Sequence, residues 1–101
     1  MRLSGILAFA VFISVSVIAD MTPEERCEKQ GDVAEQASYM RISGVDKETA
    51  IESLKKIYNH PDTAVTANSI SGLVTVSYMA KMTPESMRIY AIDQCKKDLL
   101  K

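Results

Sequence analysis

The sequence lacks several residues on which enzyme sites are commonly built. Its 101 residues include no tryptophan, one histidine (His60) and two cysteines, Cys27 and Cys95. The two cysteines lie too far apart for a Cys-x-x-Cys redox motif, and no second histidine accompanies His60 as a metal ligand. A Gly-rich phosphate loop and a Gly-x-Ser-x-Gly elbow are also missing. We therefore expect a protein that is not an enzyme and has no cofactor, with His60 as a turn residue.

A strong excess of charge of one sign is also lacking. Twelve Lys and Arg residues stand against 13 Asp and Glu residues, and both signs are mixed along the chain. Nucleic-acid-binding domains usually carry a basic stripe or patch, which this chain does not have. We therefore expect no nucleic-acid partner.

One long apolar run is present, at residues 3–19. It follows Arg2, contains no charge, and ends on the small residue Ala19 before Asp20. This pattern is typical of a secretory signal peptide, so we predict a signal peptide at residues 1–19 and a single domain at residues 20–101. An uncleaved membrane anchor is the alternative, although the run falls just short of the roughly 20 residues that span a bilayer. The expected location is periplasmic or secreted.

Export would make a disulfide between Cys27 and Cys95 the expected state of the two cysteines. Such a bond would close almost the whole mature chain into one loop. In the chain-entropy model, this closure contributes roughly 4 kcal/mol to stability. That contribution would be large for a domain whose short chain allows only a small core.

The prolines and capping residues predict where helices begin and end. Thr22 with Pro23 and Glu25 forms a capping box that opens a helix, which runs to about Ser43 and closes at Gly44. A second helix follows Asp46 and covers residues 47–59, before Pro61. Another Thr-Pro-Glu sequence opens the last helix, at residues 84–100. The inward residues expected in the second and last helices are Ala50, Ile51, Leu54, Ile57 and Tyr58, and Met87, Tyr90, Ala91, Cys95 and Leu99.

Residues 64–79 are ambiguous between a helix and a strand. Residues 73–78 alternate like a strand and are rich in β-branched side chains, whereas no second run of this kind offers a partner in the mature chain. Because an isolated strand would leave its backbone groups unpaired, we favour a helix, although Gly72 weakens it. Its inward side chains would be Ile70, Leu73, Ser77, and Met79 or Ala80.

These elements predict an all-α fold, a small bundle of about four helices linked by one disulfide. An up-down order of four helices places the start of the first helix beside the end of the last. Cys27 and Cys95 would then meet if both lie on inward faces.

The spacing of these residues resembles that of a scattered group of small exported bacterial proteins of unknown function. The resemblance rests on two cysteines, one opening the first helix and one closing the last, on a Met-x-x-Arg-like turn that contains glycine, and on scattered residues between them. It implies a helical exported protein and supplies no activity. The matching residues are Cys27, Ala34, Ala37, Met40-Arg41-Ile42-Ser43-Gly44, Tyr78, Thr83, Glu85, Ala91 and Cys95.

Two groups of side chains are candidates for binding. Glu24, Glu28, Asp32 and Glu35 make the first helix acidic, which indicates either a docking face for a basic partner or a solvated face. Methionines cluster at Met79, Met82 and Met87, as in exported proteins that hold Cu(I), although methionines also fill gaps between helices. We expect core packing and no metal site.

The leading hypothesis is an exported interaction or accessory module that binds an unknown protein partner. One alternative is an acid- or stress-responsive, chaperone-like protein, whose small core loosens as carboxylates lose their charge. A second alternative is a carrier of a metal or a small ligand. The sequence does not specify the partner or the oligomeric state.

Overall fold

The computed structural model describes residues 21–59 and 65–100, and in these residues the chain forms four α-helices and no strand. This confirms the predicted all-α bundle and the helical alternative for residues 70–79. The predicted signal peptide and His60 lie outside the described residues. Within the described ranges, no helix is long and apolar enough to cross a bilayer. The helices are α2 (Pro23–Ile42), α3 (Lys47–Tyr58), α4 (Ala67–Ala80) and α5 (Pro84–Leu99).

Each helix begins at a residue whose side chain accepts a hydrogen bond from the backbone N–H three residues later. These caps are Thr22, Asp46, Thr66 and Thr83. The predicted capping box is present, because the Glu25 N–H donates to Thr22 Oγ1 at 3.2 Å and the Thr22 N–H donates to Glu25 Oε1 at 2.8 Å. Local sequence therefore fixes all four helix starts.

Two of these caps depend on an ionised carboxylate. The pKa of Glu25 is lowered, first by the hydrogen bond from the backbone of Thr22, and the pKa of Asp46 is lowered, first by the hydroxyl of Thr49. A carboxyl whose pKa is lower in the folded state stabilises the fold above its unfolded pKa, and this contribution is lost as the pH falls through the folded pKa.

We therefore expect acid to open the starts of α2 and α3 before those of α4 and α5. Protection of the Thr22 and Thr49 N–H groups against hydrogen exchange should fall below a pH of about 4. The Ser69 and Ser86 N–H groups are bonded to threonine hydroxyls, which do not titrate, and serve as controls. Equal loss of protection at all four positions would contradict this expectation.

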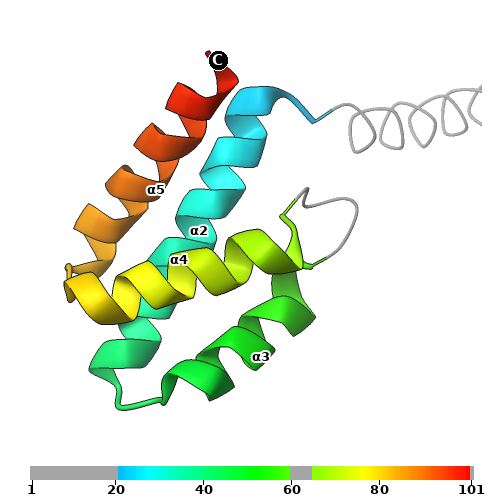
Figure 1. Ribbon diagram of the computed structural model, residues 1–101. Helices are drawn as coiled ribbons and strands as arrows, with labels where there is room; N and C mark the ends of the chain where they lie inside the picture. The colour runs from blue at the N-terminus through cyan, green and yellow to red at the C-terminus, as the bar shows by residue number, and fades with distance from the viewer. Residues whose placement is uncertain (1–20, 60–64, 101) are drawn as a thin grey trace, which may run out of the picture.

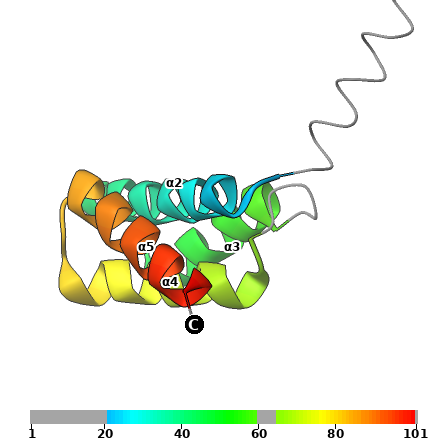
Figure 2. The same cartoon turned by 90° about the horizontal axis from the view of Figure 1, so that it is seen from above.

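The four helices form two antiparallel pairs that lie across each other (Figure 1). Helices α2 and α5 run side by side in opposite directions, as the up-down order predicts. The second pair, α3 and α4, lies obliquely across α2, and Figure 2 shows α4 in a different layer from α2. Helix α2 contacts each of the other three helices and is therefore the centre of the fold.

The core is divided into two clusters because α2 buries two faces. Val33 and Ala37 of α2 belong to the larger cluster, shared with α3 and α4, while Ala34 belongs to the smaller one, shared with α5. At the crossing of α2 and α4, the hydroxyls of Ser38 and Ser77 are fully buried and hydrogen-bonded to each other at 2.9 Å. The larger cluster comprises Val33, Ala37, Ala50, Leu54, Val65, Ile70 and Val74, and the smaller one Ala34, Met87 and Ala91.

Some inward positions were predicted wrongly. In α4 the fully buried residues are Ile70, Val74 and Ser77, and at 100° per residue Met79 lies opposite Ile70, where it is 76% exposed. Ala80 is exposed as well. Ile57, Tyr90 and Leu99 are also exposed, since α3 packs mainly on α4 and α2, and α5 packs mainly on α2. Leu99 lies one helical turn beyond Cys95, near the end of the pair.

Two glycines inside helices occupy opposite environments. A Cβ atom added at Gly31 would lie 2.7 Å from Cγ1 and 2.8 Å from Cδ1 of Ile92, whereas a Cβ at Gly72 would meet nothing within 4 Å. Gly31 therefore allows α2 and α5 to approach closely, while Gly72 weakens α4 without a packing role.

These environments predict opposite effects of alanine. Gly72→Ala should raise the free energy of unfolding by about 0.5–1 kcal/mol, through better helix propensity. Gly31→Ala gains the same helix propensity, but it should lower the free energy of unfolding by about 1 kcal/mol overall, because Ile92 must move. Urea unfolding of both variants measures the difference, and equal stabilisation by the two would show that the α2–α5 contact has room at Gly31.

Candidate interaction surface on α2

The predicted disulfide joins α2 to α5 near the ends of the described chain. Cys27 and Cys95 are bonded, with their Cα atoms 5.4 Å apart, and Cys27 is fully buried. One turn further along α2, Gly31 faces the side chains of Ile92 and Arg88. These contacts hold α2 and α5 in a fixed register.

An arginine of α5 gathers the carboxylates of α2. Arg88 Nη2 lies 2.8 Å from Glu28 Oε1, and Arg88 Nη1 lies 2.5 Å from Asp32 Oδ1 and 3.1 Å from Glu35 Oε1. Residues at positions i, i+4 and i+7 of a helix share one face, so a single guanidinium reaches all three. Hydrogen bonding, first to Asp32 and then to Glu28 and Glu35, raises the pKa of Arg88 despite partial desolvation.

Three of the four acidic residues singled out in the sequence are therefore brought together. Glu28, Asp32 and Glu35 are bonded to Arg88, while Glu24 is exposed and takes part in none of the ion pairs formed by the described residues. The sequence analysis missed Arg88. Arg88 lies seven residues before Cys95 and therefore on the same face of α5 as this cysteine. Because the predicted disulfide turns that face toward α2, the sequence could have indicated that Arg88 faces α2.

Two apolar residues continue the acidic face along α2. Tyr39 and Ile42 lie 11 and 14 residues after Glu28 on the helix, and their side chains are 51% and 61% exposed. We call the row of Glu28, Asp32, Glu35, Tyr39 and Ile42 the α2 stripe. Three carboxylates face one guanidinium, so the acidic half of the stripe has an excess of negative charge.

The C-terminal end of the stripe is fixed by two hydrogen bonds to backbone carbonyls. Arg41 Nη2 donates to the carbonyl of Met82 at 2.7 Å, and the Tyr78 hydroxyl donates to the carbonyl of Val45 at 2.6 Å. Burial raises the pKa of Tyr78, so this donor keeps its proton at neutral pH. The turns that follow α2 and α4 are thereby tied to neighbouring elements.

The three methionines have different environments. Met87 is fully buried and Met82 packs against the smaller core cluster, whereas Met79 is exposed. Met87 and Met82 thus have the packing role that the sequence suggested. In the described part of the chain, no group of three His, Cys, Asp or Glu side chains is arranged to hold a metal ion.

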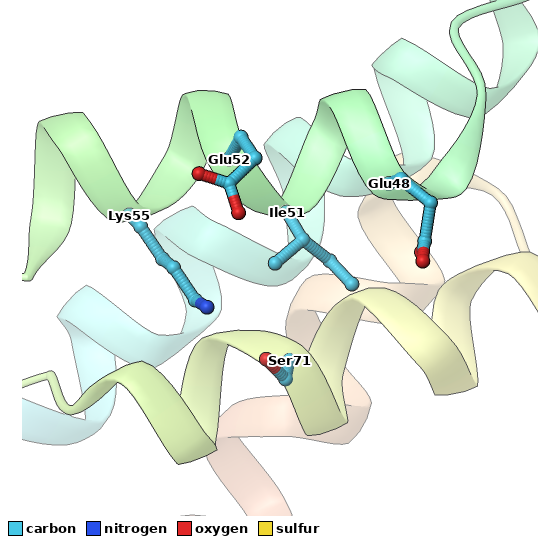
Figure 3. Close-up of a pocket in the computed structure, with 5 residues that line it drawn as sticks. All are labelled: Glu48, Ile51, Glu52, Lys55 and Ser71. Atoms are coloured by element: carbon cyan, nitrogen blue, oxygen red, sulfur yellow. The ribbon is translucent and has the colours of Figure 1, made fainter.

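A separate groove lies between α3 and α4 (Figure 3). It has a volume of about 230 Å³ and is open to solvent. Its lining combines charged, apolar and hydroxyl side chains, from Glu48, Ile51, Glu52, Lys55 and Ser71. The sequence analysis did not identify this groove, since it depends on how α4 packs beside α3.

Comparison of this chain with protein families, with curated proteins and with solved structures finds no match.

Proposed function

We propose that this chain is an exported, non-enzymatic interaction module that binds a basic, partly apolar segment of a partner protein along the α2 stripe. The observation that carries the proposal is the alignment of two half-exposed apolar side chains, Tyr39 and Ile42, with three carboxylates that outnumber their guanidinium. The export part of the proposal is supported by the disulfide, because such bonds persist in oxidising compartments.

The chemistry of the stripe favours, as its partner, a helix of another protein that is basic at one end and apolar at the other. Recognition of an amphipathic helix uses anchors spaced at i, i+3, i+4 and i+7, and the residues of the stripe likewise recur every three or four positions. Arginine of a partner forms strong, short hydrogen bonds with carboxylates, while Tyr39 and Ile42 lose water on contact. The partner class is therefore a basic amphipathic helix.

The frame of the stripe reduces the cost of binding. The disulfide, the close approach at Gly31 and the Arg88 hydrogen bonds hold α2 in one position before a partner arrives. A preorganised surface loses less conformational entropy on association. This rigidity supports a docking role for α2.

The experiment compares capture of envelope proteins by three forms of the immobilised chain. The double variant Tyr39→Ser/Ile42→Ser removes the apolar half of the stripe, and Met79→Ser, which removes a still more exposed apolar side chain on α4, is the control. We expect a stoichiometric partner that the wild type and Met79→Ser retain, that the double variant loses, and that elutes as salt is raised. A partner retained equally by all three forms, or no stoichiometric partner, would refute the stripe.

A further inference from the structure

Arg88 uses only part of the hydrogen-bonding capacity of the α2 stripe. It bonds a single oxygen of each carboxylate, namely Glu28 Oε1, Asp32 Oδ1 and Glu35 Oε1. The other oxygen of Asp32 lies 4.0 Å from the ammonium of Lys29. Among the described residues, no hydrogen bond or ion pair involves Oε2 of Glu28 or of Glu35. These two oxygens can accept hydrogen bonds from a partner while the bonds to Arg88 stay intact.

Glu35 differs from Glu28 in having an exposed aromatic ring one helical turn further along. Tyr39 follows Glu35 at i+4, a spacing at which Cβ atoms lie about 5–6 Å apart on a helix. Helical side chains lean toward the N-terminus of their helix, so the Tyr39 ring, which is half exposed, leans toward the turn that carries Glu35. One turn after Glu28 stands Asp32 instead. An unused carboxylate oxygen and an aromatic ring are thus neighbours only at Glu35 and Tyr39.

This pair of groups suits a guanidinium better than an ammonium. A guanidinium is planar, donates hydrogen bonds from its edge and stacks flat on an aromatic ring, whereas an ammonium is a strongly hydrated point charge. One arginine can therefore donate to Glu35 Oε2 and lie within about 6 Å of the Tyr39 ring, the range of cation–π attraction. The Glu35 side chain is 30% exposed and that of Glu28 is 54% exposed, so solvent weakens a bond to Glu35 less.

The position of Ile42 sets the spacing of the partner's residues. At 1.5 Å per residue, the midpoint between Glu35 and Tyr39 lies about 7.5 Å along α2 from Ile42. Two residues four positions apart on a partner helix are about 6 Å apart along its axis. An arginine and an apolar residue at this spacing therefore match the two places on the stripe.

We propose that the α2 stripe selects an arginine of its partner, seated between Glu35 and Tyr39, with an apolar residue four positions away that packs on Ile42. This inference rests on the function proposed above and narrows the partner from a basic helix to one with a specific arginine. A lysine at the same place reaches Glu35 but does not stack on Tyr39, and Glu28 accepts either cation. The selectivity thus comes from the ring of Tyr39 and not from the total charge of the partner.

The test is an NMR titration of the isotope-labelled protein with two alanine-based helical peptides of about 16 residues. The peptides differ only in carrying arginine or lysine four positions from a leucine. We expect the arginine peptide to bind with a dissociation constant of about 1 mM and the lysine peptide about fivefold more weakly. Tyr39→Leu keeps an apolar contact without the ring and should bind both peptides alike. Tyr90→Leu removes another exposed tyrosine, on α5, and should keep the preference for arginine.

Two carboxylate variants form a matched pair in the same titration. Glu35→Gln should remove most of the preference for arginine, whereas Glu28→Gln, which loses a carboxylate bonded to the same guanidinium, should weaken both peptides alike. Equal binding of the two peptides to the wild type, or a preference for arginine that survives Tyr39→Leu, would overturn this inference and leave the stripe itself in place. Binding of neither peptide would also overturn it, and the capture experiment described above would then decide independently on the stripe.

Discussion

Replacing Cys27 and Cys95 with alanine is expected to lower the free energy of unfolding by about 4 kcal/mol. The bond joins residues 68 apart, so its loss frees nearly the whole described chain in the unfolded state. A domain of this size has a total stability of roughly 4–12 kcal/mol. The double variant should therefore keep roughly 0–8 kcal/mol of this stability and unfold at a much lower urea concentration than the wild type, which urea unfolding followed by circular dichroism measures.

Reduction of the wild-type protein separates the effect of the cross-link on stability from the effect of packing the two sulfur atoms. Cys27 is fully buried, so alanine at this position also removes contacts in the interior. The reduced wild type keeps both sulfur atoms and loses only the bond. We expect it to lose most of the same stability, and a loss below about 1 kcal/mol on reduction would show that the chain ends stay together without the bond.

The helix boundaries were predictable because their causes are local. Thr22, Asp46 and Thr83 cap helices through bonds to residues three positions later, and prolines follow two of these caps. Helix α4 was harder, since Leu73–Tyr78 suits a strand as well as a helix. The sequence offers no second strand with which this segment could pair, and for this reason the helix was predicted correctly.

The buried face of α4 could not be predicted, because apolar residues occupy most of its circumference. Leu73, Val74, Val76 and Met79 offer no single apolar stripe. The helix is oriented by its crossing with α2, where the small residues Ser38 and Ser77 meet. A contact between residues 39 positions apart leaves no periodic signal in the sequence, so Met79 was assigned to the wrong side.

The candidate surface was predictable in part. Helical spacing placed the carboxylates of Glu28, Asp32 and Glu35 on one face, but their binding to Arg88 depends on how α2 and α5 are paired. The groove between α3 and α4 was not predictable, because Ser71 comes from a different helix than the charges it faces.

Arg88→Ala is expected to lower the free energy of unfolding by about 2 kcal/mol. The substitution removes three charge-assisted hydrogen bonds and the part of the side chain that packs beside Gly31, and it leaves three carboxylates repelling one another. The carboxylates are partly exposed, so solvent screening keeps the loss well below the sum of three buried ion pairs. Urea unfolding at low and high salt measures the loss, which should shrink as salt rises.

Two further variants test whether the geometry of the guanidinium causes this effect. Arg88→Lys should recover less than half of the loss, since one ammonium cannot offer the planar set of donors that reaches Glu28, Asp32 and Glu35 together. Lys97→Ala breaks the exposed pair with Asp93 on the same helix, at 3.2 Å, and should cost only about 0.3 kcal/mol. If Arg88→Ala lowered the free energy of unfolding no more than Lys97→Ala, the ion pairs between Arg88 and the carboxylates of α2 would not contribute to the stability of the fold. The α2 stripe would then depend on the disulfide and Gly31 alone for its position.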